Sequence, residues 1–232
     1  MIRKLLHKIF GNKKKVTSKP AQITDIVKLD FTDFKVVFDI GAYHGGFTDD
    51  VLTKTLDLKI HQFEPNIEAF DFLTKKYNGN NIVINNNAIS NKIGIENLYL
   101  NSYDETNSLL ASNSIDESID RLTKNISSQQ INVVTLDSYC QHHNIHFVDF
   151  VKIDTQGNSY NVLLGAEKLL KEKKIKYLYV EAEFIEIYKN QKCFSDIELL
   201  MKEYGYQVVN IFNLNYTDNG RLAWCDCLFT MK

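Results

Sequence analysis

Alternating apolar and polar segments divide the chain into predicted strands and helices. Short apolar, β-branched runs predict strands at residues 36–40, 58–63, 82–87, 147–153, 175–181 and 206–212. Helical periodicity predicts helices between several of them, at residues 47–55, 67–77, 160–172 and 194–204. Because strands that alternate with helices pair in parallel through right-handed crossovers, the pattern predicts a doubly wound α/β fold.

Two further patterns refine this architecture. The run at residues 222–231 follows the turn-like Thr217–Gly220, so it predicts an antiparallel hairpin with the run at 206–212. Residues 91–146 interrupt the alternation with a predicted strand at 95–101, a polar stretch at 102–128 holding a short helix at 115–122, and a strand at 131–135. An insertion that reaches over the strand ends is a natural place for substrate contacts.

Length and charge indicate one domain with a basic arm. The chain has 232 residues, 44% of them hydrophobic, which is enough for one core, so we expect an arm at 1–19 and a domain at 20–232. Seven of the 27 basic residues lie in the arm, which has no acid. The body therefore holds 20 basic against 29 acidic residues, about −9, which disfavours a nucleic-acid-binding body.

The arm also carries an amphipathic pattern. Apolar residues recur on one helical face, at Ile2, Leu5, Leu6, Ile9 and Phe10. This face fits an anionic membrane surface, the body of the protein or a second subunit in a homodimer equally well. No apolar run approaches the ~20 residues of a membrane span, no secretion signal is evident, and the four cysteines form no C-x-x-C pair. We expect a cytoplasmic protein, with peripheral membrane contact open.

The first strand leads into a glycine-bearing turn that suits a nucleoside cofactor. Gly41 and Gly45 allow the backbone to approach a ligand closely, and a helix follows. Dinucleotide sites need three glycines spaced G-x-G-x-x-G, whereas Tyr43 occupies the position of the second glycine here. The substitution weakens a nicotinamide dinucleotide assignment.

Acids and small residues at the following strand ends favour S-adenosyl-methionine instead. Asp39 precedes the turn, where a carboxylate orders the loop and attracts the ammonium of an amino-acid end; a purely structural cap is the alternative. Glu64 ends the second strand, at a spacing typical of an acid that binds both ribose hydroxyls, or of a partner for the helix after Pro65. Asn87 and Ala88, after the third strand, would border the adenine.

These and later motifs resemble the FkbM family of S-adenosyl-methionine-dependent methyltransferases, typically bacterial enzymes that methylate hydroxyls of sugars and polyketides. The resemblance covers residue 36 to the C-terminus and is carried by Val37–Ala42 with Gly45, Phe63–Asn66, Asn87–Ser90, Thr135–Asp137, Val151–Gly157, Gly165–Ala166, Glu181 and Asp226–Phe229. It implies the Rossmann-like class I fold, a mostly parallel seven-stranded sheet with an antiparallel C-terminal strand. It also implies cofactor contacts at Asp39, Gly41, Ala42, Gly45 and Glu64, to which we add Tyr43, Pro65 and Asp154. The family's usual glutamate two residues after Gly157 is replaced by Ser159.

Two carboxylates are the candidates for the chemistry. A sugar hydroxyl is a weak nucleophile, so a base that removes its proton is expected. Asp154 and Glu181 each lie at the carboxyl end of a predicted parallel strand, where such folds bind ligands. A helix cap near Asn158 is the competing role for Asp154. His142, His143 and His146 lack a carboxylate partner, so no metal site is predicted.

The sequence therefore predicts an O-methyltransferase that acts on a hydroxyl of a carbohydrate or glycan precursor, with S-adenosyl-methionine as cofactor. Two alternatives remain open. One is a Rossmann-type NAD-dependent oxidoreductase, and the other is a non-catalytic protein of the methyltransferase fold, which Ser159 makes credible.

Overall fold

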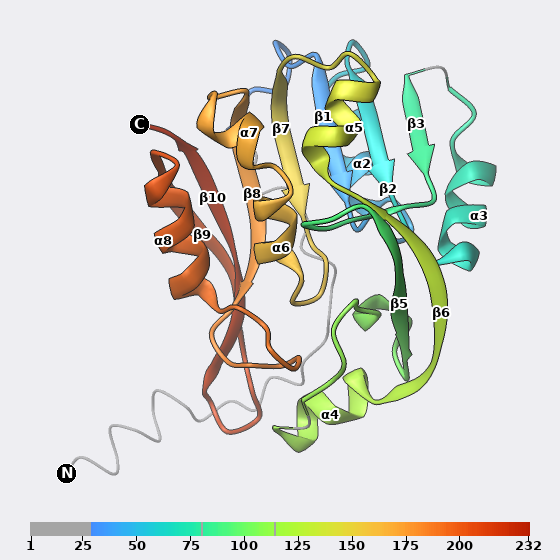
Figure 1. The fold of residues 1–232 in the computed structure, drawn as a ribbon, viewed down its shortest axis with the longest axis vertical. Coiled ribbons are helices and arrows are strands. Elements are labelled where there is room, and N and C mark those ends of the chain that lie inside the picture. Colours follow the sequence, from blue (N-terminus) through green and yellow to red (C-terminus); the bar gives the residue numbers. More distant parts are fainter. Residues whose placement is uncertain (1–28, 80, 114) are drawn as a thin grey trace.

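A computed structural model describes residues 29–79, 81–113 and 115–232. Seven strands form one sheet in the order β3-β2-β1-β7-β8-β10-β9 (Figure 1). Their bounds are β1 Val36–Ile40, β2 Lys59–Phe63, β3 Ile82–Asn85, β7 Val148–Ile153, β8 Ile175–Glu183, β9 Tyr206–Tyr216 and β10 Leu222–Met231. β10 runs antiparallel to β8 and β9, whereas the pairs among β3, β2, β1, β7 and β8 are parallel. The predicted fold class and the terminal hairpin are confirmed.

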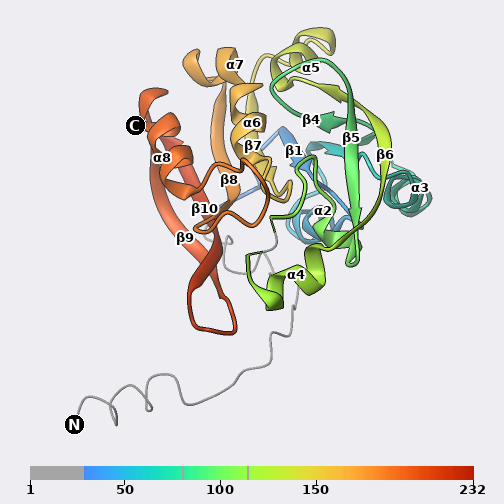
Figure 2. The same ribbon diagram turned by 60° about the horizontal axis from the view of Figure 1, so that its bottom comes forward.

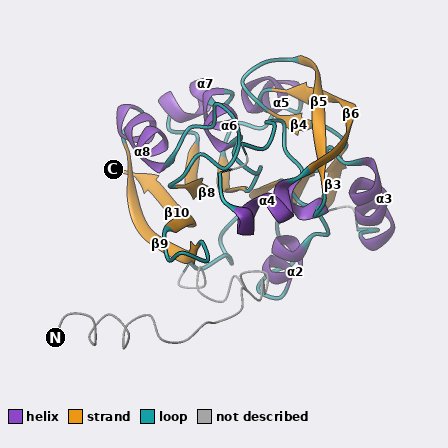
Figure 3. Cartoon of the chain, turned by 90° about the horizontal axis from the view of Figure 1, so that it is seen from below, coloured by secondary structure: helices purple, strands orange, loops and turns teal. Residues whose placement is uncertain are grey.

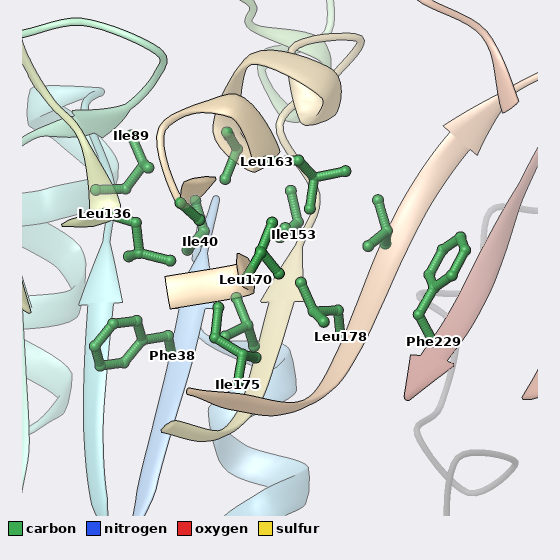
Figure 4. Packing of buried hydrophobic residues seen from close by; sticks show 14 of the residues in the cluster. Phe38, Ile40, Ile89, Leu136, Ile153, Leu163, Leu170, Ile175, Leu178 and Phe229 are labelled. Atoms are coloured by element: carbon green, nitrogen blue, oxygen red, sulfur yellow. The ribbon is translucent and has the colours of Figure 1, made fainter. Parts of the chain in front are cut away.

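Helices cover both faces of this sheet. They are α2 Gly46–Leu52, α3 Ile67–Lys76, α5 Leu136–His142, α6 Ser159–Leu164, α7 Glu167–Lys171 and α8 Phe194–Glu203. The larger core packs α5 to α8 on one face through residues such as Phe38, Ile153, Leu163, Leu170 and Phe229 (Figure 4). A smaller core on the other face joins α2 to Phe31, Phe34 and Phe150. Strands buried on both faces explain why their sequences read as continuous apolar runs.

The insertion forms a second layer beyond the strand ends. It comprises β5 Gly94–Asn101, the 3-10 turn η2 Asp104–Thr106, α4 Glu117–Thr123 and β6 Asn125–Val134, and the short β4 Ala88–Ile89 precedes it. The three strands form a separate sheet in the order β4-β6-β5. The β5–β6 hairpin and α4 extend past the carboxyl ends of β1, β2 and β7 (Figures 1 and 2). The carboxyl ends of the parallel strands therefore face this insertion, while α5 packs on the main sheet.

The structure differs from several predicted boundaries. The predicted helix at 160–172 is two helices, because the chain bends at Gly165, where a Cβ would lie 2.1 Å from the Ser90 carbonyl oxygen. β6 begins at Asn125, within the stretch predicted as loop, since it pairs antiparallel along the whole of β5. β3 ends at Asn85, short of the predicted 87, and β9 continues to Tyr216, beyond the predicted 212.

The N-terminal arm predicted at residues 1–19 lies outside the described residues. Within the described ranges, every helix is too short or too polar to cross a membrane.

Candidate functional site

The turn after β1 is clamped between the ends of two neighbouring strands. The N–H groups of Gly41 and Ala42 both donate to the Phe63 carbonyl at the end of β2, at 3.0 and 3.1 Å. Gly41 has a φ of +77°, and a Cβ there would lie 1.8 Å from the Asp154 carbonyl oxygen at the end of β7. Only glycine combines this backbone conformation with such close contact. The requirement for glycine at position 41 is therefore steric.

A buried ion pair between Asp39 and Lys152 supports the turn after β1. The Asp39 carboxylate is fully buried and accepts a hydrogen bond from Thr48 Oγ1 at 3.0 Å. Lys152 Nζ lies 3.3 Å from Asp39 Oδ1 and donates to the Gly41 carbonyl oxygen at 2.6 Å. Burial raises the pKa of Asp39, and the Lys152 charge opposes that effect. Asp39 thus orders the turn, and its carboxylate faces Lys152 and Thr48.

Lys152 also contacts Asp154, which follows β7. Its Nζ lies 3.6 Å from Asp154 Oδ2, so one ammonium group contacts the turn after β1 and the acid after β7. Although burial opposes the charged form, Asp39 and Asp154 hold the pKa of Lys152 at about 12. The register that pairs Asp39 with Lys152 across β1 and β7 produces this link.

Glu64, at the end of β2, has the geometry of a diol acceptor. Its Oε2 accepts the Tyr43 N–H and its Oε1 accepts the Asn66 N–H, both at 2.8 Å. A carboxylate has about four acceptor positions, so two remain for hydroxyl donors. Burial raises the pKa of Glu64 to about 7, against the lowering effect of these two N–H groups. Glu64 also contacts the start of α3, whose N-cap is Asn66, so the two roles predicted for it are compatible.

Side-chain amides hold the ends of β2 and β3 together. Asn85 Nδ2 donates to the Gln62 carbonyl, and Asn86 Nδ2 donates to the carbonyls of Glu64 and Pro65. Asn87 lines a hollow of about 440 Å³ beside α5, and Ala88 is buried in β4. Pro65 therefore follows Glu64 at the end of β2, and Asn87 and Ala88 follow the end of the neighbouring strand β3.

Asp154 and Glu181 are brought together by Gln156. The Gln156 Nε2 donates to Asp154 Oδ1 at 2.8 Å and to Glu181 Oε2 at 3.0 Å. Its Oε1 accepts from the Tyr188 hydroxyl at 3.2 Å, which orients the amide. Gln156 has a φ of +51°, in the left-handed region that few non-glycine residues occupy. Asp154 does not cap α6, where Asn158 holds the N-cap position.

The surroundings of Glu181 favour its protonated form. Burial and the nearby Asp154 charge raise the pKa of Glu181 well above its usual value. The Asp154 side chain keeps 40% of its surface exposed, so it can reach a ligand. A partly buried acid that retains its proton beside a carboxylate that is 40% exposed is an arrangement suited to proton transfer.

Two more acids extend this row: the sequence placed Asp226 in a family motif without giving it a role, and it did not point to Glu183. Asp226 lies opposite Glu181 on β10, accepts from Tyr179 and Asn213, and has a pKa raised by burial to about 6. Glu183 is buried two residues after Glu181, and burial raises its pKa to about 8. Because side chains two residues apart lie on the same face of a strand, the sequence could have placed Glu183 beside Glu181. The positions of Lys152, Gln156 and Tyr188 beside these acids could be found only from the three-dimensional structure.

Packing contacts account for three further polar residues, His44, His143 and Ser159. His44 stacks on Tyr43 and packs against Phe72. His143 packs on Tyr139, and the described ranges contain no group of three metal-ligating side chains. Ser159 is buried at the start of α6. These contacts account for the packing of each residue without assigning it chemistry.

Comparison with known proteins identifies the family in which this arrangement occurs. The family model described as the methyltransferase FkbM domain matches residues 39–208, more than half of the chain. No curated protein sequence matches the chain at a significant level.

Solved structures share the fold at low identity. A Listeria monocytogenes protein, assigned in its description to the S-adenosylmethionine-dependent methyltransferases, aligns with a TM-score of 0.56 and 9% identity, over 91% of this chain and 98% of that one. Precorrin-6y C5,15-methyltransferase from Geobacter metallireducens aligns with a TM-score of 0.51 and 13% identity, over 95% and 92%. Magnesium protoporphyrin IX methyltransferase from Synechocystis, solved with bound SAM, gives 0.50 and 8%, over 89% and 74%.

Proposed function

Since the chain belongs to the FkbM methyltransferase family, we propose that it methylates a hydroxyl oxygen of a carbohydrate or glycan precursor. The cofactor is S-adenosyl-methionine. The family match supports a methyltransferase over the nicotinamide oxidoreductase that the sequence left open. The bridged carboxyl pair Asp154 and Glu181, beside the turn after β1, is the observation that carries the O-methylation proposal.

The residues around the turn fit this cofactor. Glu64 offers free acceptor positions for the ribose hydroxyls while two N–H groups fix its orientation. Gly41, Ala42 and Gly45 keep the turn free of bulky side chains, and Tyr43 presents its N–H to Glu64. Pro65, Asn87 and Ala88 would border the adenine. Asp39 would hold the cofactor turn in place through its ion pair with Lys152. Asp154 would contact the cofactor from the end of β7.

The chain's own residues handle the proton and the acceptor. When bound, the cofactor supplies a methyl group on a positively charged sulfur. Gln156 holds Asp154 and Glu181 in a fixed orientation. Glu181 retains its proton, and the exposed Asp154 carboxylate accepts the hydroxyl proton as the acceptor oxygen becomes nucleophilic. Correct orientation of that oxygen provides much of the acceleration.

Binding and turnover test separate parts of this proposal. Calorimetry with S-adenosyl-homocysteine should detect binding that Glu64→Ala weakens about tenfold to a hundredfold, since hydrogen bonds to a charged group contribute roughly 1.5–3 kcal/mol. Glu68→Ala, four residues later on the exposed start of α3, is the matched control and should bind normally. Unchanged affinity in Glu64→Ala would contradict the cofactor site.

Turnover is measured as transfer of labelled methyl groups to a panel of monosaccharides, sugar phosphates and oligosaccharides. Measured at saturating S-adenosyl-methionine, Asp154→Asn should lose at least about a hundredfold in rate, whereas the exposed control Asp71→Asn should keep its activity. Cofactor binding without transfer to any acceptor would favour the non-catalytic alternative. Transfer to a nitrogen or carbon acceptor alone would overturn the O-methylation proposal.

A further inference from the structure

A second hollow lies within the insertion, separate from the turn after β1. It encloses about 420 Å³, within the range of small-molecule sites. Its walls come from β5, α4, the start of β6, the segment before α4 and the loop after β8, through Tyr99, Ala111, Ser112, Asp120, Lys124, Asn125 and Lys189. Seen from the carboxyl ends of the strands, α4 lies across the middle of the molecule (Figure 3).

Hydrogen bonds between distant segments build this hollow. The Lys189 N–H donates to the Ala111 carbonyl at 2.8 Å, and Ser112 pairs with Tyr188 in a β-bridge. The Ser112 hydroxyl lies 2.9 Å from Thr123 Oγ1, which ties the segment to α4. These contacts join residues far apart in sequence, so the lining is part of the fold.

The lining has a net positive charge in an acidic protein. Lys124 and Lys189 are exposed, and within the described ranges neither forms an ion pair. Asp120 is the lining acid, and its buried Oδ1 has no hydrogen-bond partner among the described residues. Two ammonium groups, one free acceptor and the polar groups of Ser112 and Asn125 suit an anion that also carries hydroxyls.

A chain of hydrogen bonds connects the hollow to the proposed reaction centre. The hydroxyl of Tyr188, next to Lys189, lies 3.2 Å from Gln156 Oε1 and 3.0 Å from the Thr106 carbonyl oxygen, so its one proton can be donated to either acceptor. Ser108, bridged to Tyr99, donates its hydroxyl to the Gln156 carbonyl at 2.6 Å. Gln156, which holds Asp154 and Glu181, is therefore hydrogen-bonded to Ser108 and Tyr188, the β-bridge partners of the lining residues Tyr99 and Ser112.

We propose that this hollow binds the phosphate-bearing end of a glycan acceptor, while a hydroxyl elsewhere on that acceptor meets Asp154. This rests on the proposed function. Lys124 and Lys189 hold the phosphate oxygens, since the lysine ammonium is a common phosphate ligand. Asp120 and Asn125 bind sugar hydroxyls, and Tyr99 offers an aromatic wall with a polar end. The acceptor is thus a sugar phosphate or a phosphate-linked glycan.

The test measures binding without turnover, so it is independent of methyl transfer. Amide chemical shifts of the full chain are followed by NMR during titration with glucose 1-phosphate, with glucose and with inorganic phosphate. We expect glucose 1-phosphate to shift the resonances of Tyr99, Ser112 and Asn125 and to bind more tightly than either of the other two probes.

The variant Lys124→Gln/Lys189→Gln should weaken glucose 1-phosphate binding at least about tenfold. Lys54→Gln/Lys75→Gln removes the same charge from exposed residues elsewhere and should bind normally. Equal affinity in both double variants, shifts confined to other parts of the chain, or inorganic phosphate binding as tightly as the sugar phosphate would each overturn the proposal.

Cofactor binding keeps the two proposals distinguishable. The lysine double variant should bind S-adenosyl-homocysteine as the parent does, because both lysines lie away from Glu64. A chain that binds glucose 1-phosphate but no S-adenosyl-homocysteine would refute the proposed function and leave the anion site intact.

Discussion

Neutralising Lys152 should destabilise the protein through Asp39. Lys152→Met keeps the length of the side chain but leaves the Asp39 carboxylate, which is fully buried, without its cation. It also removes the donor to the Gly41 carbonyl. Removing one partner of a buried ion pair costs about 3–5 kcal/mol, because an uncompensated charge remains. Against a total stability of roughly 5–15 kcal/mol for a domain, this loss is large.

The double variant Asp39→Asn/Lys152→Met should recover most of that loss. Replacing both members of a buried pair is often neutral, since both desolvation penalties disappear. The unpaired Gly41 carbonyl leaves a residual cost of about 1 kcal/mol. Because Lys152 also contacts Asp154, the double variant should regain stability without regaining the full methyl-transfer rate.

Urea unfolding, followed by the fluorescence of Trp224 and by circular dichroism, measures these free energies in a double-mutant cycle. The exposed pair Lys35 and Asp57, at 2.7 Å, provides the matched control, and Lys35→Met should have no measurable effect on stability. The reasoning is refuted if Lys152→Met loses less than about 1 kcal/mol, or if the double variant is as unstable as the sum of the single variants.

Three further outcomes follow from the structure. Because Glu64 has a pKa of about 7 and must lose its proton to accept two hydroxyls, S-adenosyl-homocysteine affinity should rise about tenfold from pH 6 to pH 8; calorimetry of Glu64→Gln should show a flat profile. Gly41→Ala should cost at least about 2 kcal/mol in chemical unfolding, whereas Gly46→Ala, in α2 with open space around it, should be neutral or stabilising. Asp137→Ala should lower the thermal midpoint by an amount equivalent to about 1 kcal/mol, because Asp137 accepts the N–H groups that open α7; an unchanged midpoint would contradict that role.

Much of the fold was predictable because local patterns encode it. The β1 and β10 bounds match the predicted runs, since apolar β-branched residues between turn signals leave few other structures. Part of the site was predictable for the same reason. Asp154 follows β7, and Glu181 follows the last residue of β8 that pairs with β7, so both had to reach the same edge of the sheet.

Other features depended on which segments meet in three dimensions. The Asp137 carboxylate accepts the N–H groups of Lys168 and Leu169 in α7, about thirty residues later in the chain. Gln156 lies within the family motif Val151–Gly157 and was not among the predicted site residues, yet its amide joins both catalytic candidates. No local pattern predicts such contacts, because each partner lies on a different element.

The sequence alone determined the order of strands and helices, the glycine requirement of the turn after β1 and the family of the chain, because each depends on neighbouring residues or on motifs in a set order. The tertiary structure decided that Lys152 joins Asp39 to Asp154, that Asp39 is enclosed beneath the turn, and that the insertion encloses a positively charged hollow. The physical reason is that side-chain chemistry follows from burial and charge partners. Strand register and chain crossings set those partners between residues more than a hundred positions apart.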